Sequence, residues 1–153
     1  MQIRIATSAD AAPISALIQN LSGPFFLSSD RAGAEPFLDS INEQAILNYV
    51  TSNNFSYLIA EDAGVLAGVV AIRDNKHLFH LFVASAYQGT GLGRRLWEVV
   101  RSAAIAKGNA GDFTVNSSLN AIAVYSKFGF SPTSEVRQMH GISFQPMALS
   151  GGA

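Results

Sequence analysis

A run of glycines in the second half of the chain is the feature of this sequence best suited to binding an anion. Gly89, Gly91 and Gly93 occupy alternate positions between an apolar segment that ends at Val83 and a stretch with helical periodicity. Glycine lets the backbone approach a ligand closely because it has no Cβ. The first turn of a helix adds unpaired N–H groups and partial positive charge. The loop therefore predicts a binding site for an anion, most often a phosphate.

Two common phosphate-binding loops do not fit these residues. A P-loop requires a lysine and a hydroxyl residue after its last glycine, whereas Gly93 is followed by Arg94 and Arg95. A dinucleotide fingerprint that used Gly89 and Gly91 would require a glycine at position 94 and a place near the first strand. A nucleotide-binding protein is therefore disfavoured. A packing role is the remaining alternative, but three alternate glycines exceed what a turn requires.

Composition predicts one compact globular domain. The 153 residues are 48% hydrophobic and 14% charged, and we place the domain at residues 1–149 with a loose tail at 150–153. A net charge of −1 predicts no nucleic-acid partner and no membrane partner. The absence of cysteine excludes disulfides, thiolate metal sites and a cysteine nucleophile, and no metal is expected. Without a signal-peptide pattern, a cytoplasmic location is expected.

The elements around the loop follow from hydrophobic periodicity. Strands are predicted over residues 2–6, 55–61, 65–73, 76–83 and 113–116, helices over 8–21, 45–50, 91–107 and 119–128, and a hairpin over 133–149 turning at His140-Gly141. Thr7 to Asp10 reads as a capping box. Residues 22–41 are expected to be irregular because glycine and proline interrupt them. This order predicts an α+β fold with a single mixed, mostly antiparallel central sheet flanked by helices.

The helix predicted over residues 91–107 carries one apolar stripe. The residues expected to be buried along it are Leu92, Leu96, Val99, Val100 and Ala103. Gly108 fits the end of this helix. The stripe would hold the glycine loop against the sheet.

Two motifs in succession resemble the GNAT superfamily of N-acetyltransferases. Gln88-x-x-Gly91-x-Gly93, after a strand ending in Leu-x-Val, is similar to the acyl-CoA-binding signature of that family. Ala121-x-x-x-Tyr125-x-x-Phe-Gly-Phe is similar to the helix that follows it. The resemblance covers residues 77–130 closely and the element order over almost the whole chain. It implies a splayed central strand pair, acetyl-CoA as co-substrate, and acetyl transfer to a primary amine of a small molecule or peptide by direct attack in a ternary complex.

The resemblance also implies which residues contact coenzyme A. Backbone amides of the loop would hold the pyrophosphate, a role that falls on Gln88, Gly89, Thr90, Gly91, Leu92, Gly93 and Arg94. The strand residues Leu81, Phe82 and Val83 would pair with the pantetheine arm, and an N–H there would polarise the thioester carbonyl. Asn116 and Asn120 either contact the arm or cap a helix or turn.

Tyr125 and two histidines are the candidate catalytic residues. The resemblance implies that Tyr125 protonates the departing thiolate, with packing of its ring as the alternative. No Asp or Glu lies between Lys76 and Val83, where many family members carry a carboxylate base. His77 and His80 lie there instead, and histidine suits a general base. Their spacing predicts opposite faces of the strand, so at most one would face the acceptor, and for either a structural role is the alternative.

Residues 22–50 are expected to cover the acceptor site. This segment contains the aromatic residues Phe25, Phe26, Phe37 and Tyr49, and the acids Asp30, Glu35, Asp39 and Glu43. Such a cover would suit a cationic amine or a peptide amino terminus, unless the rings are core and the acids a solvated face. The protein is expected to be a monomer or homodimer. A non-catalytic acyl-CoA sensor is the alternative function: the missing strand carboxylate favours it, and Tyr125 favours the enzyme.

Overall fold

The computed structural model describes residues 1–151. Its strands are β1 (Gln2–Ile5), β2 (Phe55–Asp62), β3 (Val65–Arg73), β4 (His77–Val83), β5 (Phe113–Ser117), β6 (Ser131–Pro132), β7 (Arg137–Met139) and β8 (Ile142–Leu149). Its α-helices are α1 (Ala11–Leu21), α2 (Glu35–Asp39), α3 (Glu43–Thr51), α4 (Leu92–Ala106) and α5 (Ile122–Lys127). None of the helices formed within this range is long and apolar enough to cross a membrane.

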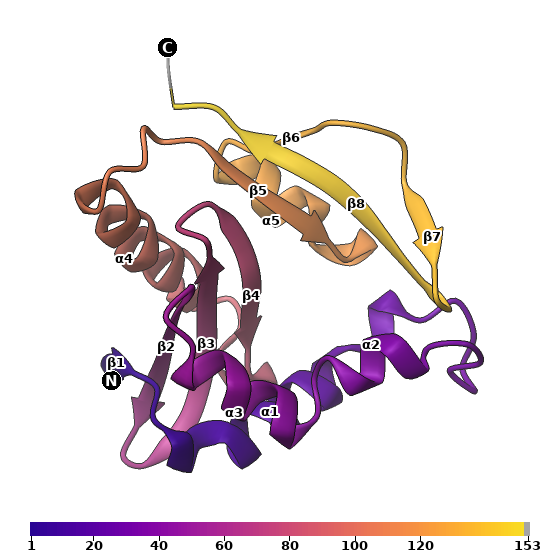
Figure 1. Cartoon of the computed structure of the whole chain (residues 1–153), viewed down its shortest axis with the longest axis horizontal. Helices are drawn as coiled ribbons and strands as arrows, with labels where there is room; N and C mark the ends of the chain where they lie inside the picture. Colours follow the sequence, from indigo (N-terminus) through magenta and orange to yellow (C-terminus); the bar gives the residue numbers. More distant parts are fainter. Residues whose placement is uncertain (152–153) are drawn as a thin grey trace.

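The strands form a mixed sheet whose central pair diverges. Their order is β1-β2-β3-β4-β5-β8-β6, and β7 pairs with β8. Among the described pairings only β4 and β5 run parallel. Those two strands match at His77 with Thr114 and Leu78 with Val115, beyond which they separate (Figure 1). The predicted α+β fold, mostly antiparallel with a splayed central pair, is confirmed.

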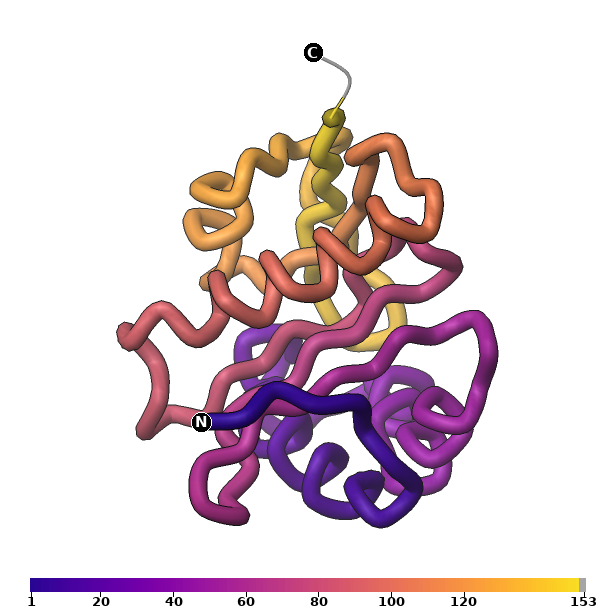
Figure 2. The backbone as a smooth tube through the Cα atoms, turned by 90° about the vertical axis from the view of Figure 1, so that its left-hand side faces the viewer, coloured from indigo at the N-terminus to yellow at the C-terminus, as the bar shows by residue number. Residues whose placement is uncertain are grey.

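Helices cover both faces of the first four strands. Figure 2 shows the N-terminal helices on one side of these strands and α4 on the other. Ile14 of α1 and Ile46 of α3 pack in one core cluster with Val69 of β3. Leu96 of α4 packs in a second cluster with Val70. Adjacent residues of β3 thus point to opposite faces, as the period of a strand requires.

The buried stripe of α4 differs from the predicted one. The buried residues are Leu92, Leu96, Trp97, Val100 and Ala104. Val99 is 42% exposed, so its predicted burial is wrong, and Ala103 is only partly buried. Residues 92, 96, 100 and 104 form one row at four-residue spacing. Trp97 is buried beside that row, and its ring centroid lies 5.0 Å from that of Phe113.

A helix also forms where irregular structure was predicted. Within residues 22–41, Gly23–Phe25 form a 3₁₀ turn and α2 covers Glu35–Asp39. Pro36 stands in the first turn of α2. Proline is accepted there because the N–H it lacks has no partner within the helix. The prediction failed because it read this proline as a breaker.

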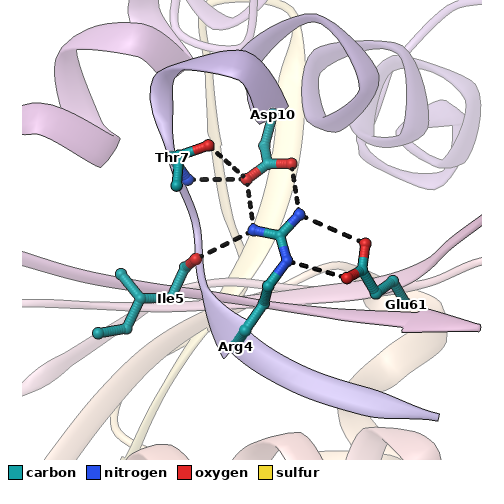
Figure 3. A network of polar contacts seen from close by, with 5 residues as sticks. All are labelled: Arg4, Ile5, Thr7, Asp10 and Glu61. Carbon is teal, nitrogen blue, oxygen red and sulfur yellow. Dashed lines mark hydrogen bonds and ion pairs between the residues drawn. The ribbon is translucent and has the colours of Figure 1, made fainter. Parts of the chain in front are cut away.

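A polar cluster ties β1 to the first helical turn (Figure 3). The guanidinium of Arg4 donates to both carboxylate oxygens of Asp10 at 2.9 Å and to Glu61 of β2 at 3.0 Å. The Thr7 N–H donates to Asp10 at 2.7 Å, and the Asp10 N–H donates to the Thr7 carbonyl. The predicted capping box is therefore confirmed. The hydrogen bonds from Arg4 hold the pKa of Asp10 below its usual value.

The end of the chain lies beside the loop before β5. The Gly151 N–H donates to the carboxylate of Asp112 at 3.1 Å. The rest of the tail predicted over residues 150–153, namely residues 152–153, lies outside the described residues.

Candidate active site

The glycine loop between β4 and α4 contains two residues in the left-handed region. Gly89 has φ +77° and Gly91 has φ +86°, values that L-residues with a side chain rarely adopt. A Cβ at either position would meet no atom within 4 Å, so both face open space. Gly93 has no positive φ, and its Cβ would lie in ordinary contact with Val83, 3.7 Å away. Backbone conformation therefore requires glycine at 89 and 91, but not at 93.

This loop presents a row of free N–H groups. None of the six N–H groups of residues 89–94 donates a hydrogen bond of normal geometry within residues 1–151. The first bond at the start of α4 runs from the Arg95 N–H to the Gly91 carbonyl at 3.1 Å. The side-chain Nε2 of Gln88 donates to the Val83 carbonyl at 2.9 Å, which fixes the loop to the end of β4. Free N–H groups at a helix N-terminus attract an anion.

Two adjoining cavities follow this loop. The loop cavity, about 600 Å³, is lined by Gly89, Gly91, Gly93 and Arg94, among others. The strand cavity, about 370 Å³, opens where β4 and β5 separate and is lined by Leu81, Phe82, Val83, Asn116 and Asn120. Leu81 and Val83 line both cavities, so the two cavities adjoin each other along β4, and we call them together the passage.

Several predicted side chains already have partners within the protein. Asn120 accepts a hydrogen bond from the Ser118 hydroxyl at 2.6 Å. The guanidinium of Arg94 lies 5.1 Å from the Phe128 ring centre. Lys127 is a further cation on the loop cavity. Sequence reasoning missed it, although it follows Tyr125 by two residues on the motif helix.

Tyr125 lies where the loop cavity and the strand cavity meet. It lines both cavities, and its side chain is 7% exposed. The ring packs against Phe128 and Phe130, with centroids 6.1 and 5.8 Å away. Burial raises the pKa of the phenol, so the hydroxyl keeps its proton at neutral pH. The structure thus places a protonated hydroxyl at the junction of the passage.

A β-bulge in β4 overturns the prediction that the two histidines face opposite sides. Ala71 of β3 pairs with His80 and Ile72 pairs with Leu78, which leaves Phe79 as an extra residue in β4. An extra residue shifts the alternation of side chains by one. His77 and His80 consequently line the same space, which we call the aromatic cavity, of about 440 Å³.

His80 is held by a buried tyrosine. The Tyr57 hydroxyl lies 2.8 Å from His80 Nδ1, and desolvation raises the pKa of Tyr57, so the phenol keeps its proton. If Nδ1 carried the imidazole proton, the phenolic proton would have no acceptor in the interior, at a cost of about 1–3 kcal/mol. Tyr57 therefore donates to Nδ1, and Nε2 carries the ring proton. Burial, assisted by nearby His77, lowers the pKa of His80 to about 3, so this residue is a neutral N–H donor.

His77 is bonded differently. Its Nδ1 lies 2.7 Å from Oγ1 of Thr114 on β5, and its Nε2 has no hydrogen-bond partner in the described part of the chain. Burial, and to a lesser degree the charge of Arg73, lowers the pKa of His77 to about 4. The ring is therefore uncharged at neutral pH, and a neutral imidazole nitrogen can accept a proton.

The segment predicted to cover an acceptor contributes rings but no acids to the aromatic cavity. Phe25, Phe37 and Tyr49 line it. Phe26 and the four acids Asp30, Glu35, Asp39 and Glu43 do not, and all four acids are exposed. The expected mildly acidic cover is therefore wrong. Sequence reasoning also missed Arg73, although the strand pairing of β3 places it opposite His77.

Asn116 connects the aromatic cavity to the passage. It lines the strand cavity and the aromatic cavity, as do Phe25, Phe79 and Phe82. The three cavities therefore lie in succession, from the glycine loop, past Tyr125, to the two histidines. An anionic carrier held at the loop can thereby extend to a second molecule in the aromatic cavity.

Comparison with known proteins agrees with this geometry. The sequence matches the model of the acetyltransferase (GNAT) domain over residues 27–150. Similar solved structures include a GCN5-related N-acetyltransferase from Rhodopseudomonas palustris, with 22% identity, 97% of this chain and 94% of that chain covered, and a TM-score of 0.79. The PaiA N-acetyltransferase of Thermoplasma acidophilum, in complex with coenzyme A, has 17% identity, covers 97% of each chain and has a TM-score of 0.72.

A third similar structure is that of an enzyme named for a protein substrate. The ribosomal-protein-S18-alanine N-acetyltransferase of Escherichia coli has 21% identity, with 97% of this chain and 92% of that chain covered and a TM-score of 0.70. At these identities the structures show a shared fold. No curated protein matches the sequence.

Proposed function

Because the chain belongs to the GNAT acetyltransferase family, through the domain match over residues 27–150, we propose that it moves an acetyl group from acetyl-CoA to a primary amine of a small molecule or peptide. The amine attacks directly while both substrates are bound. One observation carries the proposal: six free N–H groups at residues 89–94 open onto a passage that leads along β4 to a second cavity.

The residues of this passage fit coenzyme A. The diphosphate is held by the free N–H groups of the loop, with charge added by Arg94 and Lys127 at the rim of the loop cavity. The pantetheine arm lies along Leu81, Phe82 and Val83, where β4 pairs with β3 on one side but has no partner on the side of β5. Acetyl-CoA supplies the acetyl group, whose bond to sulfur is replaced by a bond to the amine nitrogen. One proton leaves the amine, and one proton is added to the departing thiolate to give the thiol. One solved relative of the same fold binds coenzyme A.

Tyr125 is the proposed proton donor to the departing thiol. Its hydroxyl is protonated at neutral pH and lies at the junction of the loop and strand cavities. A free thiol has a pKa of about 8.5, so a phenol with a raised pKa donates only where it is held close to the sulfur. The buried packing of Tyr125 supports this assignment, because it holds the ring in one place beside the passage.

The two histidines divide the remaining tasks. We assign proton acceptance to His77 Nε2, in the tautomer whose Nδ1 carries the ring proton and donates a hydrogen bond to the Thr114 hydroxyl; the ring is uncharged at neutral pH. His80, whose Nδ1 is engaged by Tyr57, donates a hydrogen bond through Nε2. Neither task needs the strand carboxylate that the sequence lacks.

The test combines binding and turnover. Isothermal titration calorimetry with acetyl-CoA measures binding, and thiol release over a panel of amines measures transfer. Gly91→Glu places a side chain and a negative charge at the free N–H groups, so binding should be lost. Gly64→Glu is the matched control, because Gly64 also has a positive φ (+83°) and open space, in the turn between β2 and β3.

Two results would contradict the proposal. Unchanged acetyl-CoA affinity in Gly91→Glu would refute the loop assignment. Tight acetyl-CoA binding without thiol release for any amine would instead favour the non-catalytic sensor.

A further inference from the structure

The aromatic cavity is built around three rings in mutual contact. The centroids of Tyr49, Phe55 and Phe79 lie 4.8 Å (Tyr49 to Phe55), 4.9 Å (Tyr49 to Phe79) and 5.0 Å (Phe55 to Phe79) apart. All three line the cavity. Rings at these separations interact favourably with one another and with a further ring in an edge-to-face arrangement. The cavity therefore offers a preformed surface to a planar apolar group.

One weakly paired positive charge, that of Arg73, lies beside these rings. Arg73 lines the cavity with its guanidinium carbon 5.4 Å from the Phe79 ring centre. Its Nε lies 3.7 Å from a carboxylate oxygen of Asp74, and side chains of this pair are 41% and 67% exposed. Such an exposed pair is weak, and the guanidinium donates no hydrogen bond of normal geometry within residues 1–151. Its N–H groups remain available to a ligand.

The walls of the aromatic cavity itself carry no acidic side chain in the described part of the chain. The other titratable groups on its walls are Tyr49, which burial keeps protonated, and the neutral histidines His77 and His80. A ligand with several ammonium groups would lose water there without gaining a carboxylate partner. The charge pattern disfavours polyamines and aminoglycosides and favours an anionic group.

We propose that the acceptor is an alkylamine that also carries an aromatic ring and a carboxylate, the class to which the aromatic amino acids belong. The inference rests on the proposed acetyl transfer. The ring of the acceptor packs on Tyr49, Phe55 and Phe79, and its carboxylate receives paired N–H groups from Arg73, a geometry that a guanidinium provides. The amine then lies among the remaining walls of the cavity, which include His77.

The test compares acceptors that differ only in the carboxylate. Thiol release is measured for L-phenylalanine and for phenethylamine, with spermidine and kanamycin as polycations. The wild-type kcat/KM should be about tenfold higher for L-phenylalanine than for phenethylamine, in keeping with one partly exposed charge-assisted contact. Arg73→Gln should remove this difference by raising the KM for L-phenylalanine alone. Arg101→Gln is the control, because Arg101 is an exposed residue of α4 outside the aromatic cavity.

The outcomes separate this inference from the proposed function. Faster turnover of spermidine or kanamycin than of L-phenylalanine, or equal use of the matched pair, would overturn the inference while acetyl transfer stands. Calorimetry with the same amines measures their binding independently of turnover. If L-phenylalanine binds, Arg73→Gln weakens that binding about tenfold and no thiol is released, the proposed acetyl transfer is overturned but the proposed class of ligand stands. Binding that Arg73→Gln leaves unchanged would overturn the inference whether or not thiol is released.

Discussion

Removal of the Tyr57 hydroxyl is a direct test of how the site sets the state of His80. In the wild type this hydroxyl donates to Nδ1 across 2.8 Å inside the protein. Tyr57→Phe keeps the ring but leaves a buried imidazole nitrogen without a partner. The expected loss of unfolding free energy is about 2 kcal/mol, within the usual range for a buried group left unsatisfied. For a domain of this size, that loss lowers the melting temperature by about 4–8 °C.

The tautomer of His80 gives a second and sharper measurement. A hydrogen bond that favours one tautomer by about 1.4 kcal/mol or more makes that tautomer at least about tenfold more populated. Heteronuclear NMR of the imidazole nitrogens should therefore find the proton of wild-type His80 on Nε2. In Tyr57→Phe the two tautomers should approach equal populations, and the pKa of His80 should rise because the bond that favours the neutral ring is gone.

Tyr49→Phe is the matched control for this measurement. Tyr49 also lies near His80, with ring centroids 5.9 Å apart, but its hydroxyl donates to the Ser40 carbonyl at 2.8 Å. Its removal should leave the His80 tautomer unchanged. A wild-type His80 with its proton on Nδ1 would refute the reasoning, because Tyr57 would then be an acceptor and Nε2 would be free to act as a base.

Three further predictions concern turnover, acid and packing. Tyr125→Phe should lower kcat at least about a hundredfold while the acetyl-CoA affinity measured by calorimetry changes little; an unaltered kcat would return Tyr125 to a packing role. The folded-state pKa values of His77 and His80 lie below their ordinary 6.5, so the unfolded chain binds protons first as the pH falls. Urea denaturation should then show unfolding free energy falling by up to about 1.4 kcal/mol per pH unit for each histidine below about pH 6, and a flat profile to about pH 4 would contradict the burial of both. Gly68→Ala should destabilise the fold by about 1–3 kcal/mol, because the added Cβ would lie 3.0 Å from Leu96 Cδ1 and 3.1 Å from the Phe82 carbonyl oxygen; Gly23→Ala, which has no atom within 4 Å, is the control in the same thermal melt.

Local patterns in the sequence predicted the fold and the glycine loop. The strand-forming runs of β2 and β3 and the helical stripe starting at Leu92 each depend on a few neighbouring residues, and these elements are present in the structure. Gly89 and Gly91 were recognised because glycine lets the backbone approach a ligand closely, and the structure shows that both also adopt a left-handed backbone. Such features can be predicted because their cause lies within one short segment.

The features that were missed depend on contacts between segments. The extra residue at Phe79 is defined only by pairing with β3, and without it His77 and His80 fall on opposite faces. The walls of the aromatic cavity come from segments far apart in the chain, so the role of Arg73 has no local signal. Pro36 begins α2 although the same residue type interrupts a helix elsewhere. Periodicity alone cannot resolve these cases.

The short pairing between β4 and β5 has a mechanical consequence. Two residue pairs join the strands there, so the sheet consists of two parts, β1-β2-β3-β4 and β5-β8-β6, that are joined by a narrow hinge at His77 and Leu78. Opening the wedge beyond that hinge breaks no further ladder between these strands. A long ligand bound in the wedge would contact both parts of the sheet. Its affinity would then depend on the angle between the two parts as well as on the groups that contact it.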